Sequence, residues 1–309
     1  MAIQEVDFES IPIIDLCTLN SPCIHQRHQL RREIAQACTQ VGFFDIKSHG
    51  ISDVLINRTY KAAHQLFSLS EEHKMACYLA TSEYFRGYSP LYGKKSSNTD
   101  LEGATQDKPL GSLSEAFDIG YELSGDLQKE ESLLPGFRAT YLQYFAEVLE
   151  LARGLMRIFA LALDQDEGYF QSMVKYPGVA SRMMHYPPPP VKGQETPGLA
   201  AHTDYQCFTG PRPRSSSAGP QPSWEVGSGT ADPGTLIVNI SDCFAFWTNN
   251  KFKSTIHRVA NSTGEERHSI PFFGVDYDTT ISVGEYIRDK LSLSYVGHDG
   301  EAAGDRIKL

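Results

Sequence analysis

Apolar positions in the N-terminal half of the chain recur at the spacing of amphipathic helices. Three such stripes predict helices over residues 28–41, after residue 52, and over residues 137–159, the last about six turns long. Gly42 and Ser52 are the expected cap residues of the first two helices. The stripes are formed by Leu30, Ile34, Cys38 and Val41; by Ile56, Tyr60, Ala63 and Phe67; and by Phe137, Tyr141, Tyr144, Val148, Leu151, Leu155 and Phe159.

Short apolar runs separated by Pro, Gly and Asn dominate the chain from about residue 179. Examples are "ASRMMHYPPPP", "GTLIVNI", "STIHRVA" and "HSIPFFGVDY". This texture is typical of short strands in a sandwich or jelly roll. Two earlier runs, "IPIIDL" and "GFFDIKSHGI", predict strands within the helical half. We therefore expect an α+β fold with a β-rich core, braced by N-terminal helices.

Charge and cysteine usage narrow the class of protein. The 309 residues carry a formal net charge of -10, which argues against a general nucleic-acid binder and against docking on anionic membranes. Six scattered cysteines without a CxxC pair favour reduced thiols. The N-terminus lacks the pattern of a signal peptide, and no run of residues is apolar enough for a membrane span. We expect a cytoplasmic protein.

A candidate metal site begins at His202-Thr203-Asp204. Side chains two positions apart on a strand point to the same face, so His202 and Asp204 would project together. His257, inside another strand-like run, is the best candidate for a third ligand. Two histidines and one carboxylate leave three octahedral positions open, as in non-haem Fe(II) oxygenases. The His-x-Asp spacing alone is a weak signal.

A second pair of residues strengthens that interpretation. Ten residues after His257, the segment Arg267-His268-Ser269 places a guanidinium and a hydroxyl on one strand face. Such a pair is suited to hold a carboxylate, and a chelating oxo-acid would give a reason for it beside a metal.

Several motifs resemble the isopenicillin N synthase-like group of Fe(II)- and 2-oxoglutarate-dependent dioxygenases. They run through nearly the whole chain, from "IPIIDL", "VGFFDIKSHGI" and "LFSLSEEHK" to "SEAFDIG" and "HYPPPP". The C-terminal motifs "WTNNKFKSTIHRV" and "RHSIPFF" are the most specific. The resemblance implies a double-stranded β-helix, a distorted jelly roll. Residues 1–120 would form its helix-rich N-terminal region and residues 121–309 the long helix and core, as one integrated catalytic unit.

The resemblance also implies the roles of individual residues. His202, Asp204 and His257 would bind Fe(II), Arg267 and Ser269 would hold the distal carboxylate of 2-oxoglutarate, and Tyr186 would lie near that co-substrate. Dioxygen would be the second co-substrate, with ascorbate as a stimulant. The substrate would be a small organic molecule, hydroxylated by default or else desaturated or cyclised. The texture around "RMMHYP" leans towards fungal natural-product enzymes.

Residues 210–235 depart from the family pattern. They hold five Gly, five Pro and five Ser, and no strand of period two can be read there. The separation of His202 from His257 is nevertheless close to the usual one, which suggests a frame error or misread splice junction in the gene sequence. A real Pro-rich loop is the alternative. Two other functions stay open, an oxidase of this fold that does not use 2-oxoglutarate and a catalytically impaired paralogue.

Other conspicuous residues have simpler interpretations. His49 is expected to serve a turn, and His268 to point away from Arg267 and Ser269. His185 could face the pocket or the opposite side of its strand. Phe246 and Trp247 are expected in the core or at the edge of the pocket.

Overall fold

The computed structural model describes residues 11–82, 86–91, 113–120, 128–171, 180–188, 196–204, 208–213, 234–261 and 265–274. The helices in this part of the chain are α1 (Ile24–Gln40), α2 (Asp53–Phe67), α3 (Glu71–Ala76), α4 (Gln128–Leu133), α5 (Phe137–Ala162) and α6 (Asp242–Trp247). The strands are β1 (Ile13–Asp15), β2 (Phe43–Lys47), β3 (Gly87–Ser89), β4 (Glu115–Gly120), β5 (Ala180–Tyr186), β6 (Thr196–His202), β7 (Phe208–Pro213), β8 (Leu236–Ile240), β9 (His257–Asn261), β10 (Arg267–Ser269) and β11 (Phe272–Gly274).

The three predicted helices are confirmed as α1, α2 and α5. Every position of the long stripe is buried on α5, which is the central helix of the core. Ser52 caps α2 by accepting a hydrogen bond from the amide of Leu55, as its position predicts. Helix α1 begins at Ile24, four residues before the predicted start, because the residues that follow Ile24 are polar up to Leu30 and do not extend the apolar stripe.

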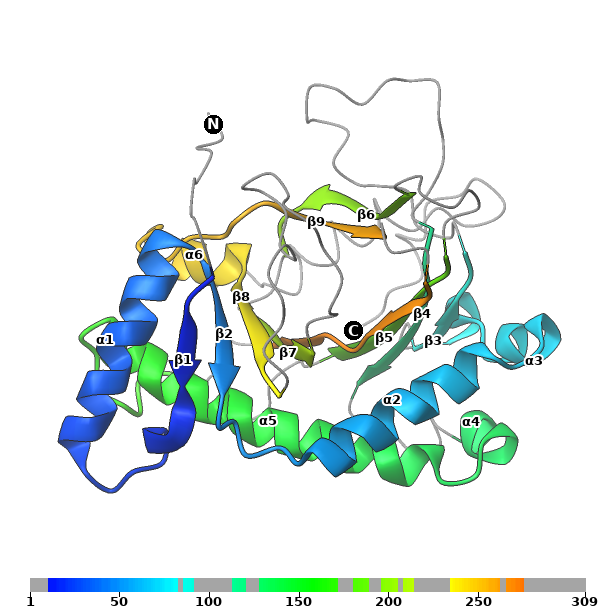
Figure 1. Ribbon diagram of the computed structural model, residues 1–309, viewed down its shortest axis with the longest axis horizontal. Coiled ribbons are helices and arrows are strands. Elements are labelled where there is room, and N and C mark those ends of the chain that lie inside the picture. The colour runs from blue at the N-terminus through cyan, green and yellow to red at the C-terminus, as the bar shows by residue number, and fades with distance from the viewer. Residues whose placement is uncertain are drawn as a thin grey trace.

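Two sheets of the described residues form the β-rich core. Nine strands make the larger sheet in the order β1-β2-β8-β7-β11-β5-β4-β3, with β10 also paired to β5, and β6 and β9 form a separate ladder. Figure 1 shows the β6–β9 ladder facing the larger sheet, while α1, α2 and α5 lie along the outside of that sheet. The expected jelly-roll core with external helices is therefore confirmed.

Strand β7 corrects the expectation that no strand lies in residues 210–235. It continues through Pro213 and pairs with β8, with an irregular register between Thr209 and Arg212. Pro211 falls inside this irregularity, and both prolines lie beyond Gly210, the last β7 residue paired with β11. A proline lacks an amide hydrogen, so bulges and unpaired edges are the places where a strand accommodates it. Residues 214–233 lie outside the described part.

The tight turn between α1 and β2 packs against the segment that leads into β9. Gly42 has φ +79°, and its amide hydrogen-bonds to the carbonyl of Ala37, which ends the helix. The Thr255 hydroxyl donates to the carbonyl of Val41, and a side chain at Gly42 would come within 2.4 Å of the Lys253 carbonyl oxygen. The corner therefore requires glycine both for conformation and for space.

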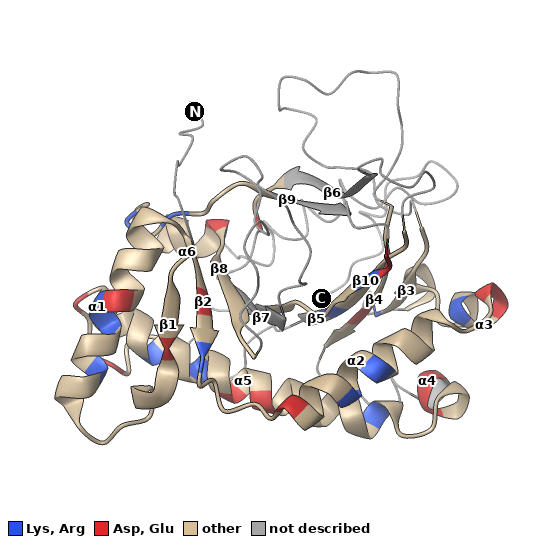
Figure 2. Ribbon diagram, viewed as in Figure 1, with Lys and Arg blue, Asp and Glu red and all other residues tan. Residues whose placement is uncertain are grey.

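Charged residues of both signs occur on α1, α3 and α5, as Figure 2 shows. Among the described helices, none has the length and apolar character needed to cross a membrane. A core position for Phe246 is wrong, because this residue of the short helix α6 is 73% exposed. Trp247 is partly buried and packs against Phe244 and Phe170, as expected of a core aromatic residue.

We predict that Gly42→Ala lowers the free energy of unfolding by roughly 1 to 3 kcal/mol more than Gly50→Ala, because inserting atoms into a packed site costs about that much. Gly50 is the matched control, since it has a similar φ of +84° but no atom within 4 Å of an added Cβ. Urea unfolding of both variants measures the difference. Equal losses would mean that the close approach of Lys253 imposes no constraint.

Candidate metal centre

The two histidines of the predicted metal site are direct neighbours on the β6–β9 ladder. His202 is the last residue of β6, His257 is the first residue of β9, and the two pair in register. Their ring centroids lie 4.3 Å apart. Asp204 follows two residues after His202, so the ladder brings both ends of the predicted triad together.

The three side chains converge on one point. His202 Nε2 lies 3.5 Å from Asp204 Oδ1, and His257 Nε2 lies 3.8 Å from the same oxygen. One ligand atom from each residue lies within 4.8 Å of the other two. Imidazole nitrogens and a carboxylate form a donor set that suits Fe(II), and an ion between them can contact all three. The residues present therefore fit a ferrous ion.

Neighbouring groups orient two of these side chains. Asn239 on β8 donates from Nδ2 to Asp204 Oδ2 at 2.7 Å, which leaves Oδ1 directed towards the histidines. His257 is buried, and its Nδ1 lies 3.1 Å from the carbonyl oxygen of Thr255. Donation from Nδ1 to this carbonyl places the lone pair on Nε2, the atom that faces Asp204.

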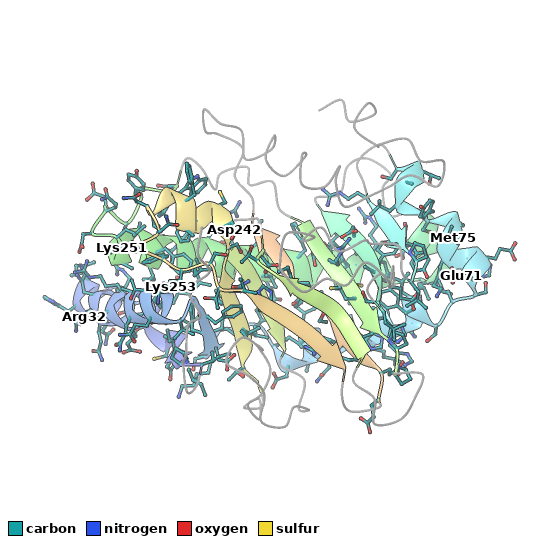
Figure 3. The ribbon with its side chains drawn as sticks, turned by 90° about the horizontal axis from the view of Figure 1, so that it is seen from above. Arg32, Glu71, Met75, Asp242, Lys251 and Lys253 are labelled. Carbon is teal, nitrogen blue, oxygen red and sulfur yellow. The ribbon has the colours of Figure 1, made fainter. Side chains whose placement is uncertain are left out.

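Asp242, the first residue of α6, connects the two segments that carry the triad. Its carboxylate accepts hydrogen bonds from the hydroxyls of Thr203 at 2.9 Å and Ser254 at 2.6 Å. Its amide donates to the carbonyl of Asp204 at 2.9 Å. Figure 3 shows Asp242 beside the strands, whereas Glu71 lies at the other end of the molecule. One carboxylate thus fixes the loop after β6 relative to the segment before β9.

The predicted carboxylate-binding residues also lie together, on the face shared by β5 and β10. Arg267 pairs with Tyr186, and its guanidinium carbon lies 5.7 Å from the centre of the tyrosine ring. Ser269 pairs with Met184, and its Oγ is buried without a hydrogen-bond partner among the described residues. A buried hydroxyl in this position fits a carboxylate oxygen of a bound co-substrate.

The structure also gives the positions of three further histidines, His268, His185 and His49. His268 pairs with His185 across β10 and β5, and both rings lie on the face opposite Arg267 and Tyr186. The position of His268 is thus confirmed, and the open question for His185 is decided. His49 serves a turn, since its Nδ1 accepts from the amide of Ile51 and its Nε2 lies 3.1 Å from the Gly234 carbonyl. Burial lowers the pKa of His49.

Sequence reasoning missed the two polar residues that support the triad. Asn239 is a polar residue within the buried run "LIVNI", and Asp242 follows two positions after that run ends. A buried polar side chain needs a partner, so an amide inside a fully buried strand was the available signal. The pattern did not show which partner it would meet.

Comparison with known protein families covers both halves of the chain. Residues 11–136 match the N-terminal model of the non-haem dioxygenases described for morphine synthesis. Residues 173–275 match the model of the 2OG-Fe(II) oxygenase superfamily.

Individual relatives and solved structures agree with the family models. A 2-oxoglutarate-Fe(II) type oxidoreductase of Aspergillus fumigatus is 30% identical, over 85% of this chain and 81% of the relative. The oxidoreductase hxnY of Emericella nidulans is 31% identical, over 85% and 78%. The crystal structure of a full-length Neurospora crassa protein in complex with alpha-KG and thymine aligns with a TM-score of 0.73 at 25% identity, covering 88% of each chain.

The fold is that of a jelly-roll oxygenase, and His202, Asp204 and His257 form a group of side chains that fits a metal ion. The chain belongs to the 2OG-Fe(II) oxygenase superfamily, in its isopenicillin N synthase-like branch. It is a non-haem dioxygenase that depends on Fe(II) and 2-oxoglutarate.

We predict that Asn239→Leu weakens Fe(II) binding roughly 10- to 100-fold, the usual cost of losing a group that orients a metal ligand. The variant removes the hydrogen bond to Asp204 Oδ2 at nearly constant volume. Anaerobic Fe(II) titration measures the affinity, and urea unfolding of the metal-free protein separates this effect from loss of stability. Asn57→Leu, at an exposed position of α2, is the control. Unchanged affinity in Asn239→Leu would show that this hydrogen bond does not position the carboxylate.

Proposed function

We propose that His202, Asp204 and His257 bind the ferrous ion of this enzyme. The observation that carries the assignment is the convergence of both histidine Nε2 atoms on Asp204 Oδ1, at 3.5 and 3.8 Å. The side chains are 21%, 12% and 3% exposed in that order, so the site is buried on the His257 side and more open at His202. Substrate and dioxygen would approach from the more open side.

We further propose that Arg267 and Ser269 bind the distal carboxylate of 2-oxoglutarate, with Tyr186 beside it. The support is their common face on β5 and β10 and the buried, unpartnered hydroxyl of Ser269 among the described residues. A guanidinium provides charge and paired donors, and the serine hydroxyl provides one more. The stacked Tyr186 ring restricts the guanidinium and excludes water from one side of it.

The chain's own residues supply position and shielding. When Fe(II), 2-oxoglutarate and dioxygen are bound, they supply the oxidising power, with release of succinate and carbon dioxide. Thr255 and Asn239 hold two of the metal-binding side chains in the required orientation. Arg267 and Ser269 fix the far end of the co-substrate, so that its keto-acid end reaches the metal in one pose.

The substrate that we propose is a small organic molecule, hydroxylated at a C–H bond unless its structure directs desaturation or ring formation. Named relatives act on unlike small molecules. One relative is a homoarginine-6-hydroxylase of Glycine max, and the similar N. crassa structure contains thymine. The fungal relatives and the "RMMHYP" texture support a role in natural-product biosynthesis.

The five described cysteines are all free, which supports a cytoplasmic location.

We also propose that residues 1–120 and 121–309 work as one catalytic unit. Support comes from α1, whose C-terminal corner contacts the Lys253–Thr255 segment directly before His257. Phe43 on β2 makes an edge contact with the His257 ring, with centroids 5.3 Å apart. The N-terminal region thus contacts both the proposed ligand His257 and Thr255, the residue that orients it.

The decisive experiment is anaerobic titration with Fe(II) and 2-oxoglutarate, followed through the weak visible charge-transfer band of the chelate. We predict that His202→Ala abolishes the band, whereas the control His73→Ala, at an exposed site on α3, leaves it unchanged. Arg267→Ala should raise the Kd for 2-oxoglutarate roughly 10- to 100-fold, because hydrogen bonds to charged groups contribute about 1.5 to 3 kcal/mol. Arg153→Ala on α5 is the matched arginine control. A band that survives in His202→Ala would overturn the ligand assignment.

Turnover separates the remaining alternatives. Succinate release that requires 2-oxoglutarate, with oxygen uptake in the presence of ascorbate, is the expected result. Substrate-dependent oxygen uptake without succinate would indicate an oxidase that does not use 2-oxoglutarate. No uptake across a broad substrate panel, despite a normal band, would favour an impaired paralogue. Sequencing the transcript across codons 205 to 235 decides between a real Pro-rich segment and an error in the gene sequence.

A further inference from the structure

A second group of side chains with the donor atoms of a metal site lies on the face opposite Arg267 and Ser269. His185, Glu266 and His268 each place one ligand atom within 4.8 Å of the other two. The rings of His185 and His268 stack with centroids 4.7 Å apart. These side chains face α2, which lies outside the sheet (Figure 1), since Phe67 of that helix contacts both rings. The group is therefore separate from His202, Asp204 and His257.

The geometry of His185 is that of a metal ligand with its second nitrogen already held. Its Nδ1 lies 2.7 Å from Glu115 Oε1, its cross-strand neighbour on β4. Glu115 is itself buried and accepts from Lys74 Nζ at 2.7 Å and from the Tyr88 hydroxyl at 2.5 Å. A carboxylate on the far nitrogen is the usual partner of a metal-binding histidine, because it fixes the tautomer and the ring.

The other nitrogen of His185 points into the cluster without a hydrogen bond. Nε2 is buried and lies 3.3 Å from Glu266 Oε2, yet it has no hydrogen-bond partner among the described residues. A separation of 3.3 Å without hydrogen-bond alignment fits two atoms aimed at a common point. Two ligands bound to one Zn²⁺ at roughly 2.0–2.2 Å with tetrahedral angles lie about 3.4 Å apart.

The remaining two residues are also prepared for a cation. The ring of His268 stacks on that of His185 and packs against Phe67, so its position is fixed from both sides. The other carboxylate oxygen of Glu266, Oε1, lies 3.2 Å from His64 Nε2 on α2, which orients the carboxylate from outside.

We propose that His185, Glu266 and His268 form a second metal site, which takes a divalent ion of the zinc class. Two imidazoles and one carboxylate are a donor set that Zn²⁺ accepts, and a fourth position remains for water. The ion would join β5, β10 and the segment before β10, with Glu115 and His64 as supporting groups. This site does not depend on the assignment of the ferrous ligands.

Zinc titration in a background without the ferrous site tests the proposal. The background variant is His202→Ala/Asp204→Ala, in which metal-stripped protein is titrated with Zn²⁺ alone against a chromophoric chelator. We expect one Zn²⁺ per chain and a higher Tm on binding. The three ligands are assembled only in the folded state, so binding of the ion stabilises that state over the unfolded one. Background protein that binds no Zn²⁺ would overturn the proposal, and a shared proton would then account for the short distances.

Neighbouring glutamates provide a matched pair of variants. Glu266→Gln in the same background should weaken Zn²⁺ binding at least tenfold and abolish the Tm shift. Glu265→Gln removes an equal charge one residue away and should change neither. Both positions are exposed, so both variants are expected to fold, which circular dichroism checks. Equal zinc affinities in the two variants would exclude Glu266 as a ligand and overturn the site as proposed.

Discussion

The structure depends on the close packing of the α1 corner against the segment that precedes β9. Gly42 has no room for a side chain beside the Lys253 carbonyl, and the Val41 carbonyl accepts the Thr255 hydroxyl. Thr255 in turn offers its own carbonyl to His257 Nδ1. A helical element and a proposed metal ligand are thus separated by one residue and two hydrogen bonds. Any change that moves α1 away from the sheet would also rotate the imidazole, so the helices outside the barrel contribute to the site itself.

Strand alternation lets one short strand serve two purposes. On β10, Arg267 and Ser269 lie on the face proposed to bind the co-substrate, with Tyr186, while His268 between them faces α2 with His185. Because the period of a strand is two, neither set can shift by one residue without exchanging both faces. Polar contacts fix that register on one face and apolar packing fixes it on the other, so the two faces stabilise the same alignment for different reasons. The polar row is Glu115, His185 and His268, and the apolar cluster is Ala116, Met184 and Tyr186.

Much of the fold could be predicted because its signals are local. The α5 stripe, the Ser52 cap and the end of α1 at Gly42 each depend on spacings of a few positions, and all three are present. Strand β7 was missed for the opposite reason. Its pairing with β8 and β11 depends on partners elsewhere along the chain. Pro211 lies where the register with β8 is irregular, and both prolines lie beyond the residues paired with β11. From composition, Pro211 argues against a strand. That argument fails here because β7 is paired with β11 only as far as Gly210, which composition cannot show.

The site shows the same division between local and distant information. His202 and Asp204 could be found as a pair because they are two residues apart, and Arg267 and Ser269 likewise. Asn239 could not, because its role comes from the β7–β8 side of the core meeting the loop after β6. The second proposed metal site combines residues that are further apart, since His185 and Glu266 lie on segments distant from each other in the chain. A ligand set assembled across strands becomes visible only when the neighbouring strands are known. A pattern of apolar positions predicts which side chains of one strand share a face, but not which strand lies beside it.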